Sequence, residues 1–186
     1  MSDRIFARLI APYARRLGNM LARGAVSVVN AASKMQTLQV KLMADEVKDG
    51  VEHFEPYGYT SHPKPGAEAI AAFFDGDRSH GAILIVGDRR FRLTGLAEGE
   101  VALYDDLGQK VHLTRTGIVI DGAGLPITIT DTSKVRIESP MLECTGEIKD
   151  LCDTTGETMS GMRATYDGHT HPGDSGGTTG TPNQGM

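Results

Sequence analysis

The second half of the chain constrains the fold most, because it combines short β-branched segments with an almost complete lack of aromatic side chains. After residue 99 only Tyr104 and Tyr166 are aromatic. Isoleucine or valine alternates with threonine or a charged residue in 127–130 and 135–138, which is the pattern of a strand with one aliphatic face. Exposure of that face to water costs about 25 cal/mol per Å² of apolar surface. The segment must therefore bury this face against a partner.

Six short strands are expected in this half, separated by tight turns such as DDLGQ, DGAG and DTSK. They span 101–104, 111–113, 117–120, 127–130, 135–138 and 141–148. Copies of the same chain are the simplest partner, because three intertwined chains would bury the aliphatic faces along one axis and leave no long free strand edge. A narrow threefold prism has room for aliphatic side chains but little for rings. A β-sandwich that packs on the first half of the chain is the alternative.

The first half has the composition of an ordinary globular core, since eight of the ten aromatic residues lie before residue 92. Apolar and β-branched segments predict five strands between Gly- and Pro-containing turns. These strands span 25–29, 38–42, 68–74, 82–86 and 91–93. Five short strands of this kind predict a small Greek-key barrel.

The N-terminal residues carry the period of a helix face. Phe6, Ile10, Tyr13 and Leu17 recur at spacings of three and four, but Pro12 argues against a single unbroken helix. Residues 1–40 contain six basic side chains and one acidic side chain. The segment is therefore either a basic amphipathic helix that lies on a membrane or phosphate surface, or a docking helix with a solvated basic side.

Charge, hydropathy and cysteine content exclude several classes of protein. A formal net charge of -5 excludes a globally basic nucleic-acid binder. No apolar run approaches the roughly 18 to 20 residues of a membrane span, and the N-terminus lacks the apolar core of a secretory signal. We therefore expect the chain to be made and kept in the cytoplasm. Cys144 and Cys152 form no CxxC motif and are expected to be reduced thiols.

The most specific chemical motif is Asp167-Gly168-His169-Thr170-His171, before a tail rich in Gly, Ser and Thr. Histidines at i and i+2 of an extended segment place both imidazoles on one side. Two imidazoles make an incomplete metal site, because first-row metals take four to six ligands. Around a threefold axis the same motif would supply six imidazoles in an octahedral cage. A pair of surface histidines in a flexible tail is the alternative.

Two enzyme classes share a short motif with this region, but each requires further residues that the chain does not contain. A cupin-like HxH metalloenzyme needs a further Glu and a later His, but Asp174 is the only ionisable side chain after His171. The GDSGG sequence around Ser175 is also found beside the nucleophile of trypsin-like proteases, but the chain lacks the accompanying His and Asp arrangement. Asp167 and Asp174 could bind a hard cation or make turns.

Three stretches carry a resemblance to a known family. They are AEAIAAFFDGDRSHGAILIVGDRRFRL, LAEGEVALYDDLGQKVHLTRTGIVIDG and DGHTHPG. Together they resemble the Mu-type phage baseplate assembly protein V family over nearly the whole chain. The resemblance implies a non-enzymatic virion protein, the homotrimeric, membrane-piercing central tail spike of a contractile tail.

The family fold implies an all-β chain with a short N-terminal helix. We expect an N-terminal helical segment at 1–24, an OB-fold barrel at 25–95, an intertwined trimeric triple-stranded β-helix shaft at 96–162 and a metal-capped apex at 163–186. The resemblance further implies that the barrel joins the baseplate hub protein and tail tube, and that the apex pierces the host outer membrane during host entry and genome ejection. The chain would assemble in the host cytoplasm and remain at the baseplate tip of the virion.

The resemblance also implies a metal at the apex. Carried over onto this sequence, His169 and His171 of three chains would hold one iron ion per trimer. Family apices also hold calcium and chloride, and Asp167 and Asp174 are candidate ligands of a second cation. Two other functions remain as alternatives, a cupin-like HxH metalloenzyme and an OB-fold module for single-stranded nucleic acid. No specific nucleic acid is expected, because ten acids outnumber seven basic side chains in 41–98.

Overall fold

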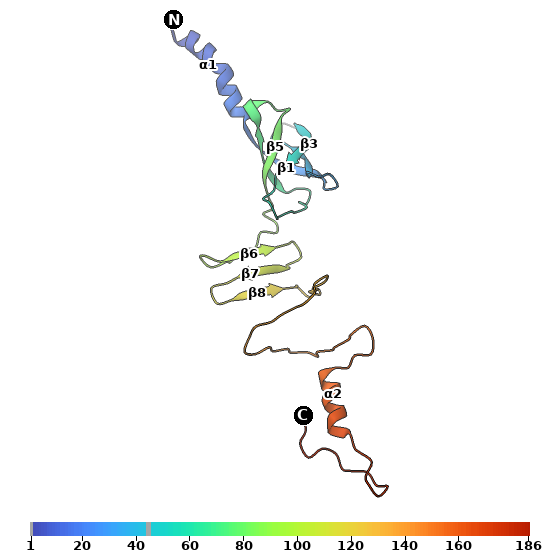
Figure 1. Cartoon of the computed structure of the whole chain (residues 1–186). Helices are drawn as coiled ribbons and strands as arrows, with labels where there is room; N and C mark the ends of the chain where they lie inside the picture. Colours follow the sequence, from blue (N-terminus) through green and yellow to red (C-terminus); the bar gives the residue numbers. More distant parts are fainter. Residues whose placement is uncertain (1, 44–45) are drawn as a thin grey trace. The chain divides into compact units, whose positions relative to one another are not determined.

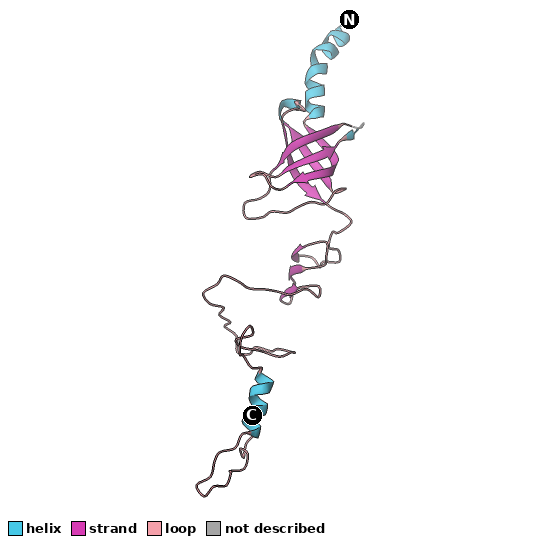
Figure 2. Cartoon of the chain, turned by 90° about the vertical axis from the view of Figure 1, so that its right-hand side faces the viewer, coloured by secondary structure: helices cyan, strands magenta, loops and turns pink. Residues whose placement is uncertain are grey.

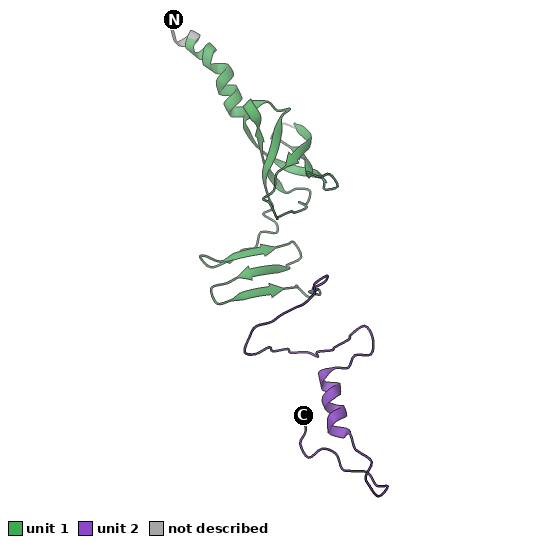
Figure 3. Ribbon diagram, in the orientation of Figure 1, with its two compact units in different colours: residues 1–128 green, residues 129–186 purple. Residues whose placement is uncertain are grey.

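The computed structural model describes residues 2–43 and 46–186 and contains two compact units, residues 1–128 and 129–186 (Figure 3). The first unit holds a helix, a barrel and a small sheet, and the second holds a long irregular segment followed by a helix (Figure 1). Within the described residues, no helix has the length and apolar character needed to cross a membrane.

Helix α1 (Ser2–Asn19) is continuous through Pro12, so the prediction that Pro12 interrupts the helix was wrong. Proline removes one backbone hydrogen bond and crowds the carbonyl four residues earlier. Strong helix formers, among them Ala7, Ala11 and Ala14, surround it. The helix is also largely exposed, so the carbonyl that Pro12 leaves without a backbone donor is not forced into an apolar environment.

Five strands close into a barrel in the order β1-β2-β3-β5-β4 (Figures 1 and 2). They are β1 (Leu21–Asn30), β2 (Thr37–Lys41), β3 (Val47–His53), β4 (Glu68–Phe73) and β5 (Gly81–Gly87). All neighbours are antiparallel except β3 and β5, which are parallel. The predicted five-stranded barrel is confirmed, and an OB-fold barrel is likewise five-stranded.

One of the five predicted strands was wrong and another strand was missed. Residues 91–93 form no strand, because Asp88 accepts a hydrogen bond from the backbone N–H of Arg90 and turns the chain there. The fifth strand is instead β3, where only Val51 and His53 are buried. Gly50 has a φ of +65°, and its backbone N–H donates a hydrogen bond to the Asp49 carboxylate, which interrupts the alternation by which a strand is identified.

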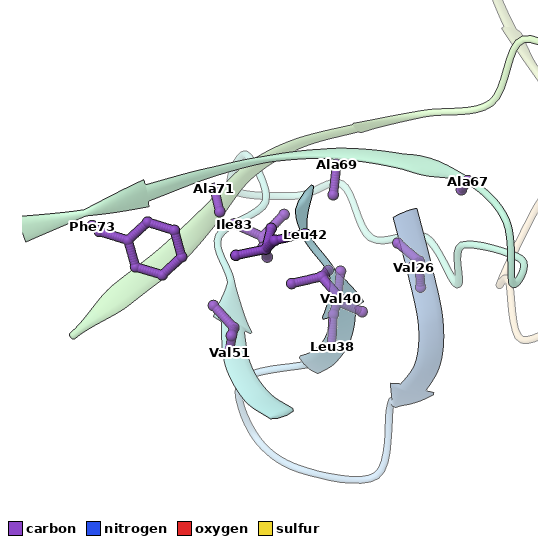
Figure 4. Close-up of a cluster of buried hydrophobic side chains, with 10 residues drawn as sticks. All are labelled: Val26, Leu38, Val40, Leu42, Val51, Ala67, Ala69, Ala71, Phe73 and Ile83. Atoms are coloured by element: carbon purple, nitrogen blue, oxygen red, sulfur yellow. The ribbon is translucent and has the colours of Figure 1, made fainter. Parts of the chain in front are cut away.

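The hydrophobic core lies inside the barrel (Figure 4). Its largest fully buried side chains are Phe73, Leu38, Ile83 and Val40. Gly81 is required beside the largest of them, because a Cβ at this position would lie 2.5 Å from Cδ1 of Phe73. The barrel thus forms a buried core without help from another chain.

Three further strands form a separate antiparallel sheet in the order β6-β7-β8. They are β6 (Val101–Tyr104), β7 (Lys110–Leu113) and β8 (Ile118–Asp121), as predicted within one residue at each end. Residues 127–148, all of them described, contain no strand. The three strands predicted there were wrong for a single chain, because an extended segment becomes a strand only when a partner accepts its hydrogen bonds.

Helix α2 (Met159–Gly168) was not predicted. The hydroxyl of Thr158 caps it by accepting a hydrogen bond from the backbone N–H of Gly161, at 3.0 Å. Threonine is a favoured cap, so this residue was the signal for the helix. Its 10 residues cross the expected boundary between 96–162 and 163–186, and end directly before the histidine motif.

Candidate oligomerisation face and metal site

The sheet β6-β7-β8 presents one face made entirely of aliphatic side chains. In the strand register Val101 lies opposite Leu113, and Leu113 lies opposite Ile118. The second row across the sheet is Leu103, Val111 and Ile120. Paired residues and residues two apart share a face, so all six side chains lie together. Their exposed fractions range from 37% for Val111 to 70% for Ile118.

The opposite face of the same sheet satisfies its own polar groups. Lys110 forms an ion pair with Asp121 at 2.7 Å, and this contact lowers the pKa of the Asp121 carboxyl. His112 Nε2 lies 3.1 Å from the carboxylate of Glu100. The pKa of Glu100 is lowered first by the backbone N–H of Ala97 and then by that of Arg115 and by His112. The aliphatic face is therefore the face that needs a partner.

Exposed aliphatic side chains that need a partner also occur in the chain beyond β8. Ile127, Ile129, Val135 and Ile137 are all more than half exposed. None of residues 84–186, every one of which is described, is buried. The alternative of a β-sandwich on the barrel does not occur in the chain, because no second sheet covers the aliphatic face within the described residues.

The two histidines of the HxH motif lie together, as predicted. His169 follows α2 in an extended conformation, with φ -73° and ψ 149°. Its ring centroid is 4.9 Å from that of His171, and the two rings are nearly perpendicular. The loop after them holds His171 in place, because the backbone N–H of His171 donates to the Thr179 hydroxyl and the Thr179 N–H donates to the His171 carbonyl, at 2.8 and 2.9 Å.

A hydrogen bond selects the ring atom of His169 that is available to a metal. Nδ1 lies 2.5 Å from the carbonyl oxygen of Tyr166. A carbonyl only accepts, so Nδ1 carries the proton and Nε2 keeps its lone pair. Ligand histidines commonly hold their second nitrogen in this way. The donor set therefore fits a metal, but one chain supplies only two imidazoles.

The two aspartates predicted for a second cation do not join the histidines. Asp167 accepts a hydrogen bond from the backbone N–H of Met186 at 2.9 Å, and Asp174 accepts one from the Ser175 hydroxyl at 3.3 Å. No cluster of three or more metal-binding side chains occurs in residues 2–43 and 46–186. Cys144 and Cys152 are both exposed and unpaired with each other. The site is thus incomplete within one chain.

Comparison with known proteins gives the same assignment as the motifs. Residues 23–90 match the family described as Bacteriophage Mu Gp45, N-terminal. The chain is 36% identical over 193 residues to the "Baseplate puncturing device gp45" of Escherichia phage Mu, and the match covers 97% of each protein. It is also 37% identical over 162 residues to the "Mu-like prophage FluMu protein gp45" of Haemophilus influenzae, with 83% of this chain and 88% of the relative covered. This near-complete coverage shows that the chain belongs to the Mu gp45 family of phage proteins.

Proposed function

We propose that this chain is a structural baseplate protein of a phage virion and forms the trimeric central spike that pierces the host outer membrane. The observation that carries the proposal is the uncovered aliphatic face of Val101, Leu103, Val111, Leu113, Ile118 and Ile120. The name of the phage Mu relative, a baseplate puncturing device, supplies the mechanical role. That name describes a device and not an enzyme.

Three copies would bury the aliphatic faces against one another around a common axis. Apolar burial is the main favourable contribution to such an association. The extended residues 127–148 would gain strand partners from neighbouring chains, which would make the shaft resistant to bending when a contracting tail drives it forward. The barrel has a complete core in one chain, which leaves its outer surface for the hub and tail tube.

The apex would be held by iron bound to His169 and His171 of the three chains. The free Nε2 of His169 and the fixed backbone of His171 support this assignment. Iron would supply cross-links between three chain ends that have no buried residue of their own. With all ligand positions filled by imidazole, the metal would be structural.

The function is tested by complementation. The phage genome lacks the gene for this protein, and a plasmid in the host cell supplies the chain during assembly. The wild-type chain should restore infectivity, and it should be found in purified baseplates. A chain with Val111→Asp and Ile120→Asp should be absent from baseplates and should not restore infectivity. Particles that infect normally without the chain would contradict the proposed role.

The metal site is tested by elemental analysis of the purified chain. The double substitution His169→Ala and His171→Ala should abolish bound iron and leave the trimer intact, because the shaft carries most of the buried area. The control is His112→Ala, which removes a histidine outside the motif and should leave the iron content unchanged. Dissociation of the trimer by the double substitution would show that the stability lies at the apex instead.

A further inference from the structure

Helix α1 carries an apolar stripe that no other described part of the chain covers. The stripe consists of Phe6, Ile10, Tyr13 and Leu17, which are 66%, 43%, 68% and 69% exposed. The helix meets the barrel at its C-terminal end, where Arg16 forms an ion pair with Asp75 at 3.3 Å and the carbonyl of Met20 accepts from the N–H of Phe73. The barrel therefore fixes the base of the helix and leaves the stripe free.

The spacing of the stripe is that of a coiled-coil seam. Its members follow one another at intervals of four, three and four residues, which are the a and d positions of a heptad. Two small residues, Ala7 and Ala14, lie along one edge of the stripe, where they permit close approach of a second helix. Apart from Leu9, which is 66% exposed and lies beside the stripe, the large apolar side chains of residues 6–17 occupy a and d positions. Such a face is narrower than the one by which a helix docks on a globular core.

The charges of α1 agree with self-association. At 3.6 residues per turn, Arg8 and Arg15 lie on the side of the helix opposite the stripe. In a bundle of identical helices packed through the stripe, these guanidinium groups would point outward and lie as far apart as the bundle allows. The remaining arginine of residues 6–19, Arg16, is already paired with Asp75. No charged side chain of residues 6–19 would be buried in the seam.

We propose that the α1 helices of three copies of this chain pack through Phe6, Ile10, Tyr13 and Leu17 into a short parallel three-helix coiled coil. The inference rests on the proposed trimer and extends it to the N-terminal end. About two heptads are too few for stable association of free helices. Helices already joined through a common shaft have a high effective concentration, so the short seam is sufficient there.

The test is disulfide cross-linking of the full-length chain with Cys144→Ser and Cys152→Ser, which removes both native thiols. Single cysteines are then introduced in the seam by Ile10→Cys or Leu17→Cys. The matched controls on the far side are Arg8→Cys and Arg15→Cys. Native mass spectrometry first establishes the oligomeric state of each variant. Under mild oxidation, the seam variants should form covalent dimers within the trimer at least tenfold faster than the far-side variants.

The possible results test the α1 coiled coil and the proposed trimer separately. A trimer in which seam and far-side cysteines cross-link equally, or not at all, would overturn the seam and leave the proposed spike intact. A monomeric chain would overturn both. The reaction is repeated with vesicles of zwitterionic and of anionic lipid, and protection of the seam cysteines by vesicles in place of cross-linking would overturn the seam in favour of a membrane-bound helix.

Discussion

The barrel and the β6-β7-β8 sheet use the same aliphatic residues with opposite results. Leu38 and Val40 on β2 are completely buried, whereas Ile118 and Ile120 on β8 are 70% and 61% exposed. β2 alternates apolar with polar residues and β8 begins with three apolar residues, but both strands have hydrogen-bonded neighbours. The difference is closure, because five strands of the barrel enclose their inner side chains and three strands of four residues each cannot. The residue pattern of a strand therefore identifies an apolar face but does not say which chain covers that face.

The comparison implies that the two regions differ in the origin of their stability. The barrel draws its stability from contacts within one chain, so its unfolding should not depend on protein concentration. The region after residue 99 should draw its stability from contacts between chains, which makes it concentration-dependent. The following changes separate the two regions.

The largest expected effect is loss of the trimer by Val111→Asp and Ile120→Asp. Two carboxylates on each aliphatic face cannot be buried without partners, so the chain should become a monomer with a folded barrel. Val119→Asp is the matched control, because Val119 lies on the opposite face of the same sheet. Analytical ultracentrifugation measures the oligomeric state, and equal dissociation by the control would show that the face is wrongly assigned.

Hydrogen exchange of residues 127–148 should show the next largest effect. These residues form no strand in one chain, yet in the wild-type trimer their amides should exchange at least tenfold more slowly than in the Val111→Asp and Ile120→Asp chain. Amides of β2 serve as the internal reference and should exchange equally in both proteins. Fast exchange of 127–148 in the wild type would mean that neighbouring chains do not pair there.

A core substitution should affect the barrel alone. Phe73→Ala removes a ring that is 1% exposed, and truncation of a buried phenylalanine destabilises by about 3–5 kcal/mol. Chemical denaturation followed by near-ultraviolet circular dichroism measures the free energy of unfolding of the barrel. Ile85→Ala on the exposed side of β5 is the control and should have a much smaller effect. Loss of the trimer by Phe73→Ala would show that the barrel contributes to assembly.

The smallest predicted effect is a pH dependence of the barrel. Burial lowers the pKa of the His53 imidazole from its ordinary 6.5, against the opposing charge of Glu55. Neutral His53 therefore contributes stability that is complete above pH 6.5 and is lost as the pH falls through the lower pKa of the folded chain. His53 Nδ1 lies 3.1 Å from the side-chain oxygen of Gln36. His53→Gln should weaken the pH dependence, because glutamine can still donate to this oxygen but does not titrate. Parallel melting curves of both proteins against pH would refute the prediction.

Several elements could be predicted from the sequence, and each failure has a local cause. A short β-branched segment between tight turns predicted β6, and β2 was predicted by alternation of Leu38 and Val40 with polar residues. These patterns missed β3, where Gly50 and the Asp49 carboxylate interrupt the strand. They also failed at 91–93, where the Asp88 side chain makes a turn. These failures come from side chains that bond to their own backbone, which residue-type patterns do not register.

For the candidate sites too, the sequence predicted the features that depend on local spacing and missed those that depend on other groups. The spacing of His169 and His171 correctly placed their rings side by side, because an i and i+2 relation depends only on local backbone. A cation-binding role of Asp167 and Asp174 depends on which groups surround them, and the structure pairs Asp167 with Met186 and Asp174 with the adjacent Ser175. The ligands that complete the histidine site would come from other chains, so no single chain contains them.

Native mass spectrometry of the full-length chain, measured over a dilution series, tests the central claim most directly. The account predicts a trimer at micromolar concentration with one bound iron ion, and no folded monomer in which the aliphatic face stays uncovered. A metal-free monomer at every concentration would contradict the account, because the six aliphatic side chains of the β6-β7-β8 sheet would then remain in water without a partner.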